Sequence, residues 1–209
     1  MTLHRPRQRH AARPLALLAF VLALPLAACG DARPEHLAPE DDLADLAVPL
    51  VDADSAAFTF PADLTGRPVV VSAVYTRCPD VCLMTMANMK NVKRELGADT
   101  ARVGFATLTF DPNRDTPSVL RAYARSWGTG PDWRLLTGDS VTVAGLMERL
   151  EIRYEVSRTD TLASGETTYH ISHTDKAILL DAEGRVVETY GGSAAVPEMV
   201  AEDARALLD

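Results

Sequence analysis

The stretch that decides the fold is residues 68–96, PVVVSAVYTRCPDVCLMTMANMKNVKREL. Its apolar first part, up to Tyr75, is typical of a strand that is covered on both faces. Residues 81–96 have the spacing of an amphipathic helix. Cys78 and Cys82 lie between these two elements. The stretch therefore predicts a buried strand that delivers two thiols to the start of a helix.

Further elements alternate along the chain on both sides of this unit. We expect strands at residues 58–60, 102–110 and 133–138, helices at 116–128, 140–152 and 197–208, and a hairpin at 176–190. The helix at 116–128 has Thr116 as its N-cap, Pro117 at its first position and Gly128 past its end. Alternating strands and helices, followed by a hairpin and a helix, predict an α/β fold of the thioredoxin type, with a central sheet flanked by helices.

The N-terminus has the parts of an export signal. Four arginines without an acidic residue precede a short apolar run at residues 15–26, which is too short for a comfortable membrane span. The run ends in Leu26-Ala27-Ala28-Cys29, which resembles a bacterial lipobox. We therefore expect residues 1–28 to be a lipoprotein signal peptide and Cys29 to carry the lipid. The alternative is an ordinary cleaved signal, with Cys29 incidental.

This N-terminus implies an exported protein, lipid-anchored at a membrane and facing the periplasm or the cell exterior of a bacterium. Residues 29–49 are acidic, alanine-rich and contain prolines. We expect them to form a flexible tether with no fold of its own. Residues 50–209 have a globular composition and suit one domain with a single core.

The charge of the mature chain bears on its partners. Loss of residues 1–28 removes four of the 21 basic residues and none of the 29 acidic ones, so the net charge moves from −8 to −12. Nucleic-acid binding needs a basic surface, and we therefore expect no nucleic-acid partner. Membrane affinity would come from the lipid instead of a basic patch.

Cys78 and Cys82 remain once Cys29 is modified. Pro79 suits the first position of a helix, so we expect Cys78 near the N-cap and Cys82 in the first turn, where thiolates are stabilised. Residues four apart on a regular helix have Cβ atoms about 5–6 Å apart, whereas a disulfide needs about 3.5–4.5 Å. A disulfide can close only if this turn is irregular. The pair suits redox exchange, a soft metal ion, or both in alternation.

A third ligand would distinguish these options. His170 and His173 precede the predicted hairpin, and in an extended strand residues three apart point to opposite faces, so at most one of them faces the cysteines. Two thiolates and an imidazole can hold both Cu(I) and Cu(II). Zinc fits less well, because a closed structural zinc site normally has four ligands.

Three motifs together carry a resemblance to a known family. They are TRCPDVC at residues 76–82, FDPNRDTP at 110–117, and SHT at 172–174 followed by LDAEG at 180–184. This combination, over roughly residues 55–209, resembles the Sco/SenC family of copper proteins that help to assemble cytochrome c oxidase. Ser172 stands where that family usually has an acidic residue, and Ala182 where its turn usually has proline.

The resemblance implies copper, as Cu(I) or Cu(II), held by Cys78, Cys82 and His173. The spacing from the histidine to the turn at residues 180–184 favours His173 over His170. The resemblance further implies a metallochaperone, with the copper-site subunit of cytochrome c oxidase or other copper and thiol-redox proteins as partners.

Two enzymatic alternatives use the same cysteines. A membrane-tethered thiol–disulfide oxidoreductase would keep a partner's cysteines reduced and would need no histidine, although the usual redox spacing is two residues and not three. A peroxidase-like enzyme would use Cys78 as the attacking thiolate, with Arg77 and Arg114 as its activating residues. We rank the metallochaperone first.

Other residues of these motifs have structural interpretations. Met86 and Met89 continue the Cys82 face at i+4 and i+7, so we expect them in the core and not on a metal ion. Asp80 suits either capping of the helix or tuning of the metal site. The segment at residues 110–117 is, at minimum, a turn that leads into a capped helix.

Overall fold

The computed structural model describes residues 1–2, 33–165 and 167–208. The predicted signal peptide and Cys29 therefore lie outside the described residues. Within the described ranges, we find no helix that has both the length and the apolar character needed to cross a membrane.

The described chain contains strands, α-helices and short 3-10 helices. The strands are β1 (Asp41–Asp42), β2 (Ala47–Asp52), β3 (Ala57–Pro61), β4 (Val69–Val74), β5 (Gly104–Thr109), β6 (Trp133–Thr137), β7 (Tyr154–Thr161), β8 (Thr167–His173), β9 (Lys176–Leu180) and β10 (Arg185–Gly191). The α-helices are α1 (Val81–Leu96), α2 (Pro117–Trp127), α3 (Ser140–Arg149) and α4 (Pro197–Ala206). The 3-10 helices are η1 (Glu35–Leu37), η2 (Ala62–Leu64) and η3 (Gly97–Arg102).

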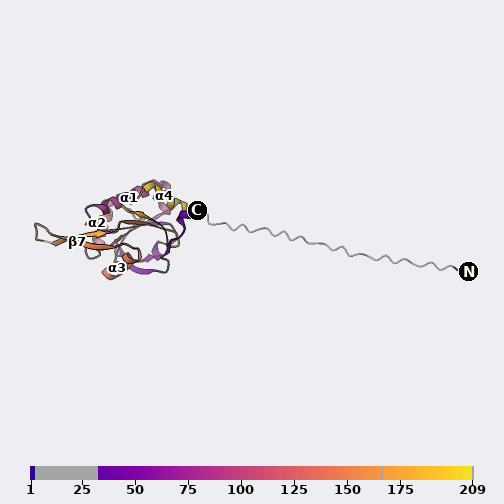
Figure 1. Ribbon diagram of the computed structural model, residues 1–209, viewed down its shortest axis with the longest axis horizontal. Coiled ribbons are helices and arrows are strands. Elements are labelled where there is room, and N and C mark those ends of the chain that lie inside the picture. The colour runs from indigo at the N-terminus through magenta and orange to yellow at the C-terminus, as the bar shows by residue number, and fades with distance from the viewer. Residues whose placement is uncertain (3–32, 166, 209) are drawn as a thin grey trace. The chain divides into compact units, whose positions relative to one another are not determined.

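A large sheet with strand order β1-β10-β9-β4-β5-β6-β2-β3 forms the centre of the fold. Strands β4, β5 and β6 run parallel, and β9 is antiparallel to β4. Every residue of β4 and β5 is buried, as expected for strands that are covered on both faces. Helices α1 and α4 pack side by side on one side of the sheet, and α3 lies on the other (Figure 1). The predicted thioredoxin-like α/β fold is confirmed.

The predicted elements correspond closely to the observed ones. Helix α1 covers residues 81–96 as predicted, and α2 starts with Pro117 and is closed by Gly128, which has a left-handed φ of 63°. Glycine adopts that conformation without steric cost. The predicted hairpin at residues 176–190 is the pair β9 and β10.

The prediction of an unfolded tether at residues 29–49 is wrong for residues 33–49. Leu37 and Leu43 are fully buried, β1 pairs with β10, and β2 begins at Ala47. The acidic residues that suggested a tether instead form contacts, such as the ion pair of Asp41 with Arg149. The two buried leucines, together with the strand pairing and the ion pairs, attach this acidic stretch to the fold. We call residues 33–46 the N-terminal strap.

The strap joins the sheet at the end farthest from the cysteines. Strand β1 pairs with the first residues of β10, and these lie beside Leu180, which pairs with Val69 at the start of β4. Arg33 reaches Asp181, the residue after β9, at 3.1 Å. The cysteines follow the other end of β4.

A second, two-stranded sheet of β7 and β8 was not predicted. Tyr154 of β7 pairs with His173 of β8, and the hairpin projects from the body of the fold (Figure 1). Most residues of β7 are exposed, so its sequence lacks the alternation of apolar and polar residues that identifies a half-buried strand.

Candidate metal centre

The two cysteines lie where the main chain passes from β4 into α1. Tyr75, directly after β4, is buried, and its carbonyl accepts a hydrogen bond from the N–H of Cys78 at 3.1 Å. The N–H of Cys82 then points at the Sγ of Cys78, with N and Sγ 3.4 Å apart. The main-chain N–H of Cys82, in the first turn of α1, thus helps to hold the Sγ of Cys78 in place.

The helix begins later than Pro79 suggested. Asp80 is the N-cap and Val81 the first helical residue, so Pro79 does not occupy the first helical position as predicted. The reason is the main chain of Asp80, whose φ of −141° and ψ of −108° are not helical. Its side chain makes no capping hydrogen bond. Cys82 lies in the first turn, as predicted, and Cys78 precedes the helix. The irregular turn that a Cys78–Cys82 disulfide requires is therefore present.

The two thiols differ in their acidity. A hydrogen bond from Cys82, supported by one from His173, lowers the pKa of Cys78 to about 4 in spite of burial. The same bond to Cys78, together with burial, raises the pKa of Cys82. Both are free cysteines. The first proton is therefore lost more readily from Cys78 than from Cys82, and a metal ion that binds both sulfurs as thiolates displaces the remaining proton.

His173, the last residue of β8, completes the group. Its Nε2 lies 3.4 Å from the Sγ of Cys82, and its Nδ1 lies 3.0 Å from the carbonyl oxygen of Thr174. A carbonyl only accepts hydrogen bonds, so Nδ1 carries a proton, and Nε2 is the ring nitrogen that faces the sulfurs. Burial opposes protonation of His173, but its hydrogen bonds to Cys78 and Thr174 raise its pKa overall.

The structure brings together the three residues that were predicted as ligands. One ligand atom from each of Cys78, Cys82 and His173 lies within 4.8 Å of the other two. Within the described ranges, no other group of three histidine, cysteine or acidic side chains has this arrangement. His170, by contrast, faces Asp160 and Arg158 on the hairpin, at 3.1 Å from each. The three residues are placed to bind a metal ion.

Two aromatic rings pack against the imidazole of His173. The ring of Phe110 lies 4.6 Å from that of His173, and the ring of Tyr75 lies 6.1 Å from it, both measured between centroids. Sequence reasoning did not assign either ring to the site, although each is the last residue of a predicted strand. Met86 and Met89 are buried in the core as predicted, whereas Met84 is exposed.

Asp175 was also missed, and it fixes the chain after His173. Its carboxylate accepts hydrogen bonds from the hydroxyl of Thr85 on α1, at 2.9 Å, and from the N–H of Ser193, at 2.7 Å. A Cβ on Gly192 would collide with Asp175 and Thr85, so glycine is needed at this contact. Ser172 is exposed. The carbonyl of Thr174, and not the side chain at position 172, therefore orients the imidazole.

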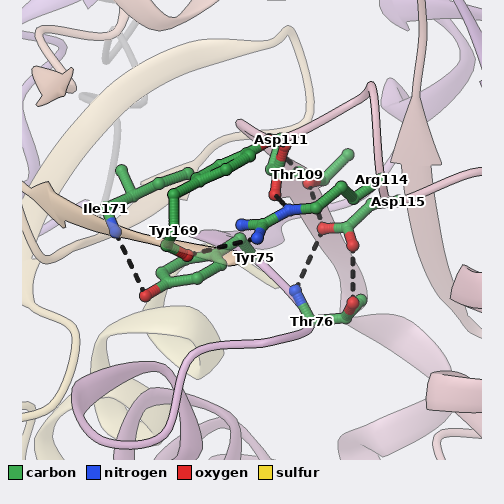
Figure 2. Close-up of polar contacts among 8 residues, drawn as sticks. All are labelled: Tyr75, Thr76, Thr109, Asp111, Arg114, Asp115, Tyr169 and Ile171. Carbon is green, nitrogen blue, oxygen red and sulfur yellow. Dashed lines mark hydrogen bonds and ion pairs between the residues drawn. The ribbon is translucent and has the colours of Figure 1, made fainter. Parts of the chain in front are cut away.

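The segment at residues 110–117 does more than lead into α2. Asp115 accepts hydrogen bonds from Thr76 in the cysteine loop, and Asp111 and Arg114 contact Tyr169 on β8 (Figure 2). Sequence reasoning missed these links. The signal was present in the charged residues of the segment, but their partners lie far away in the sequence.

Comparisons with known proteins agree with this geometry. The SCO1/SenC family model matches residues 45–209. A SCO2-like protein of Rickettsia prowazekii is 25% identical over 127 residues, which cover 61% of this chain and 60% of that protein. The mouse protein named SCO2 homolog, mitochondrial, is 27% identical over 141 residues, 66% of this chain and 53% of that protein. The chain thus matches about 60% or less of the length of these two relatives.

Solved structures with the same fold include two with copper bound. Bradyrhizobium japonicum ScoI with copper bound aligns with a TM-score of 0.65 and 28% identity, and the alignment covers 77% of this chain and 97% of that one. Yeast Sco1 with copper bound aligns with a TM-score of 0.62 and 23% identity, over 77% of this chain and 88% of that one. The family model covers most of the chain and includes all three candidate ligands. This protein therefore belongs to the SCO1/SenC family.

Proposed function

We propose that the protein is a membrane-anchored copper metallochaperone that helps to assemble the copper site of cytochrome c oxidase. The observation that carries the proposal is the group of Cys78, Cys82 and His173, whose ligand atoms lie within 4.8 Å of one another. Copper is the cargo in this proposal, and the three side chains hold it in transit.

The ligand set suits copper in both oxidation states. Thiolates select Cu(I), and an imidazole also suits Cu(II). The sulfurs are buried, which limits exchange with solvent, whereas His173 is only partly buried. A partner's ligands would reach the ion from the histidine side. Three ligands from this chain leave room for a ligand of the partner, and transfer needs such an opening.

Membrane attachment is the second element of the proposal. It rests on the lipobox-like ending at Cys29, and it places the domain in an exported compartment at a bacterial membrane. Mass spectrometry of detergent-extracted protein should give an N-terminal peptide that begins with acylated Cys29. A soluble mature protein with a different first residue would refute this element.

Copper titrations of the full-length protein test the central proposal. We expect one copper per chain for the wild type and none for the double variant Cys78→Ser and Cys82→Ser, because serine hydroxyls are poor ligands for Cu(I). Incubation of the loaded protein with the apo copper-site domain of an oxidase subunit should transfer the metal. A protein that binds copper but transfers none to this domain contradicts the oxidase role.

The adjacent sulfurs favour one alternative, a thiol–disulfide oxidoreductase that reduces a partner's cysteines. Reduction of a partner requires both sulfurs and no imidazole ligand. If the protein is an oxidoreductase, the variant His173→Ala should still reduce a disulfide substrate. If it is a metallochaperone, the same variant should fail to transfer copper. A peroxidase-like role lacks support, because Arg114 contacts Asp111 and Tyr169 and makes no hydrogen bond to Cys78.

A further inference from the structure

The two halves of the metal centre stand on different sheets. Cys78 and Cys82 follow β4 of the large sheet, and His173 ends β8 of the separate two-stranded sheet. No strand pairing joins these sheets among the described residues. One link between the halves is the short turn from His173 into β9, which pairs with β4, and Asp175 of this turn bonds to Thr85 on α1. The distance between the sulfurs and the imidazole further depends on contacts made by other parts of the chain.

Residues 110–115, which we call the bridging segment, contact the cysteine half through Asp115. Its carboxylate accepts hydrogen bonds from the N–H of Thr76 at 3.0 Å and from the hydroxyl of Thr76 at 2.5 Å. A third bond comes from the hydroxyl of Thr109, the last residue of β5, at 2.6 Å. Asp115 is fully buried. It thereby fixes the chain two residues before Cys78 to the end of β5.

The same segment contacts the histidine half through Tyr169, four residues before His173 on β8. The guanidinium of Arg114 lies 3.4 Å from the centroid of the Tyr169 ring and donates a hydrogen bond to the Tyr169 carbonyl at 3.1 Å. The hydroxyl of Tyr169 donates to Asp111 at 2.7 Å, and Asp111 pairs with Arg114 (Figure 2). Three contacts thus meet on one strand residue, and the Asp111–Arg114 pair links the two side chains that make them.

The bridging segment is also held together internally. The N–H of Asp115 donates to the carbonyl of Asp111 at 2.9 Å, so the two carboxylates sit on one closed turn. Phe110, at its start, packs on the His173 ring. Because both ends of the bridge belong to one hydrogen-bonded turn, a shift of either half of the centre must strain or break contacts to the other.

We propose that Asp111, Arg114 and Asp115 are positioning residues that set the separation between the two cysteines and His173. This inference rests on the proposed function, since the position of the imidazole matters only when a metal ion is bound. The histidine side of the bridge should control Cu(II), which needs the imidazole. The cysteine side should control both oxidation states.

Tyr169→Phe tests the histidine side. The change removes the hydroxyl bond to Asp111 and keeps the ring beneath Arg114. We expect about tenfold weaker Cu(II) binding, the size found for outer contacts of metal sites, with an altered Cu(II) absorption and electron paramagnetic resonance signal. Cu(I) affinity should stay close to that of the wild type, because both thiolates remain.

Tyr190→Phe is the matched control. Tyr190, on β10, also donates a hydrogen bond to a carboxylate, that of Asp203, at 2.7 Å. The substitution therefore removes the same kind of bond away from the centre. Equal Cu(II) affinity and equal spectra in Tyr169→Phe and Tyr190→Phe would overturn the proposal, since the loss would then have no effect on the site.

Thr76→Val tests the cysteine side by removing one of the two bonds from Thr76 to Asp115. Both Cu(I) and Cu(II) affinity should fall, whereas Thr100→Val, which removes hydroxyl bonds to Lys93 and Gly97, should change neither. Unchanged affinity in Thr76→Val counts against the proposal.

Thermal unfolding of each apoprotein separates positioning from folding. If Tyr169→Phe does not fold, Asp111→Asn takes its place, because it keeps an acceptor for the tyrosine and weakens the pair with Arg114. Failure of the wild type to bind copper refutes the proposed function. If the wild type binds copper and the substitutions on both sides of the bridge leave the copper affinity unchanged, only this inference is refuted.

Discussion

The sulfur half and the imidazole half of the centre are built in different ways. Cys82 is fully buried and Cys78 is 7% exposed, and they follow a strand whose every residue is buried. His173 stands on a hairpin whose partner strand is mostly exposed. The apolar core fixes the sulfurs, whereas a few polar and aromatic contacts fix the imidazole. The thiols thus depend mainly on the core, and the imidazole on contacts that single side chains make.

Oxidation of the cysteine pair should have the largest effect. A Cys78–Cys82 disulfide removes both thiolates, so copper binding should be lost in both oxidation states. The fold should remain, because such a small loop contributes little to stability compared with the core. Copper titration and thermal unfolding of reduced and oxidised samples measure both effects. Equal copper affinity in the two forms, or loss of the fold on reduction, contradicts this view of the sulfur half.

Removal of the imidazole should come next. His173→Ala should weaken Cu(II) binding by more than the roughly 100-fold upper range known for outer contacts of metal sites, and Cu(I) binding much less. His170→Ala is the control, because His170 faces Asp160 on the hairpin. Competition titrations with each oxidation state give the affinities. If His170→Ala loses the Cu(II) spectrum and His173→Ala keeps it, the ligand is His170 and not His173.

Stability measurements can sharpen the contrast between core and hairpin. Met86, on the face of α1 that bears Cys82, is fully buried, and its change to alanine should lower the free energy of unfolding by about 2–5 kcal/mol. Val156 of β7 is 59% exposed, and its change to alanine should alter that free energy by no more than about 0.5 kcal/mol. Urea denaturation of both apoproteins tests this, and comparable losses would show that the hairpin belongs to the same core.

Ser172→Asp should have the smallest effect. Ser172 is exposed, and the Thr174 carbonyl already orients His173. Exposed charge interactions are typically worth less than about 1 kcal/mol, so Cu(II) affinity should rise by less than about fivefold. Ser172→Asn has a similar size without the charge and serves as the control. A gain far above this range would mean that the residue at position 172 governs the imidazole.

The sequence revealed what depends on local pattern. Helix α1 followed from its periodicity, and the role of the cysteines followed from their place between a buried strand and a helix. His173 was selected only through the spacing of a family motif. The strap was predicted to be a tether because its acidic composition was given more weight than its apolar residues Leu37 and Leu43, which are buried in the structure. Hairpin β7–β8 was missed because its exposed strand has no apolar alternation.

The contacts that hold the site together join residues far apart in the sequence, and a local sequence pattern cannot predict them. Asp115 lies 39 residues from Thr76, and Arg114 lies 55 residues from Tyr169. A charged turn before a helix predicts a cap, and nothing in its own sequence indicates which strands it will meet. Such contacts become visible only when the sheet order is known.

The N-terminal strap has a consequence for how the protein would face its partner. Cys29 and Arg33 are four residues apart, a span of at most about 14 Å. Arg33 pairs with Asp181, whose neighbour Leu180 lies beside Val69 at the start of β4. The cysteines follow the other end of β4, roughly 20 Å away along the strand. If Cys29 carries the lipid, no more than this length of chain would separate the bilayer surface from the strap, and the domain would work close to the membrane. A partner that is itself bound to the membrane would then meet the domain by lateral diffusion, whereas a partner free in the surrounding compartment would have to come to the membrane surface.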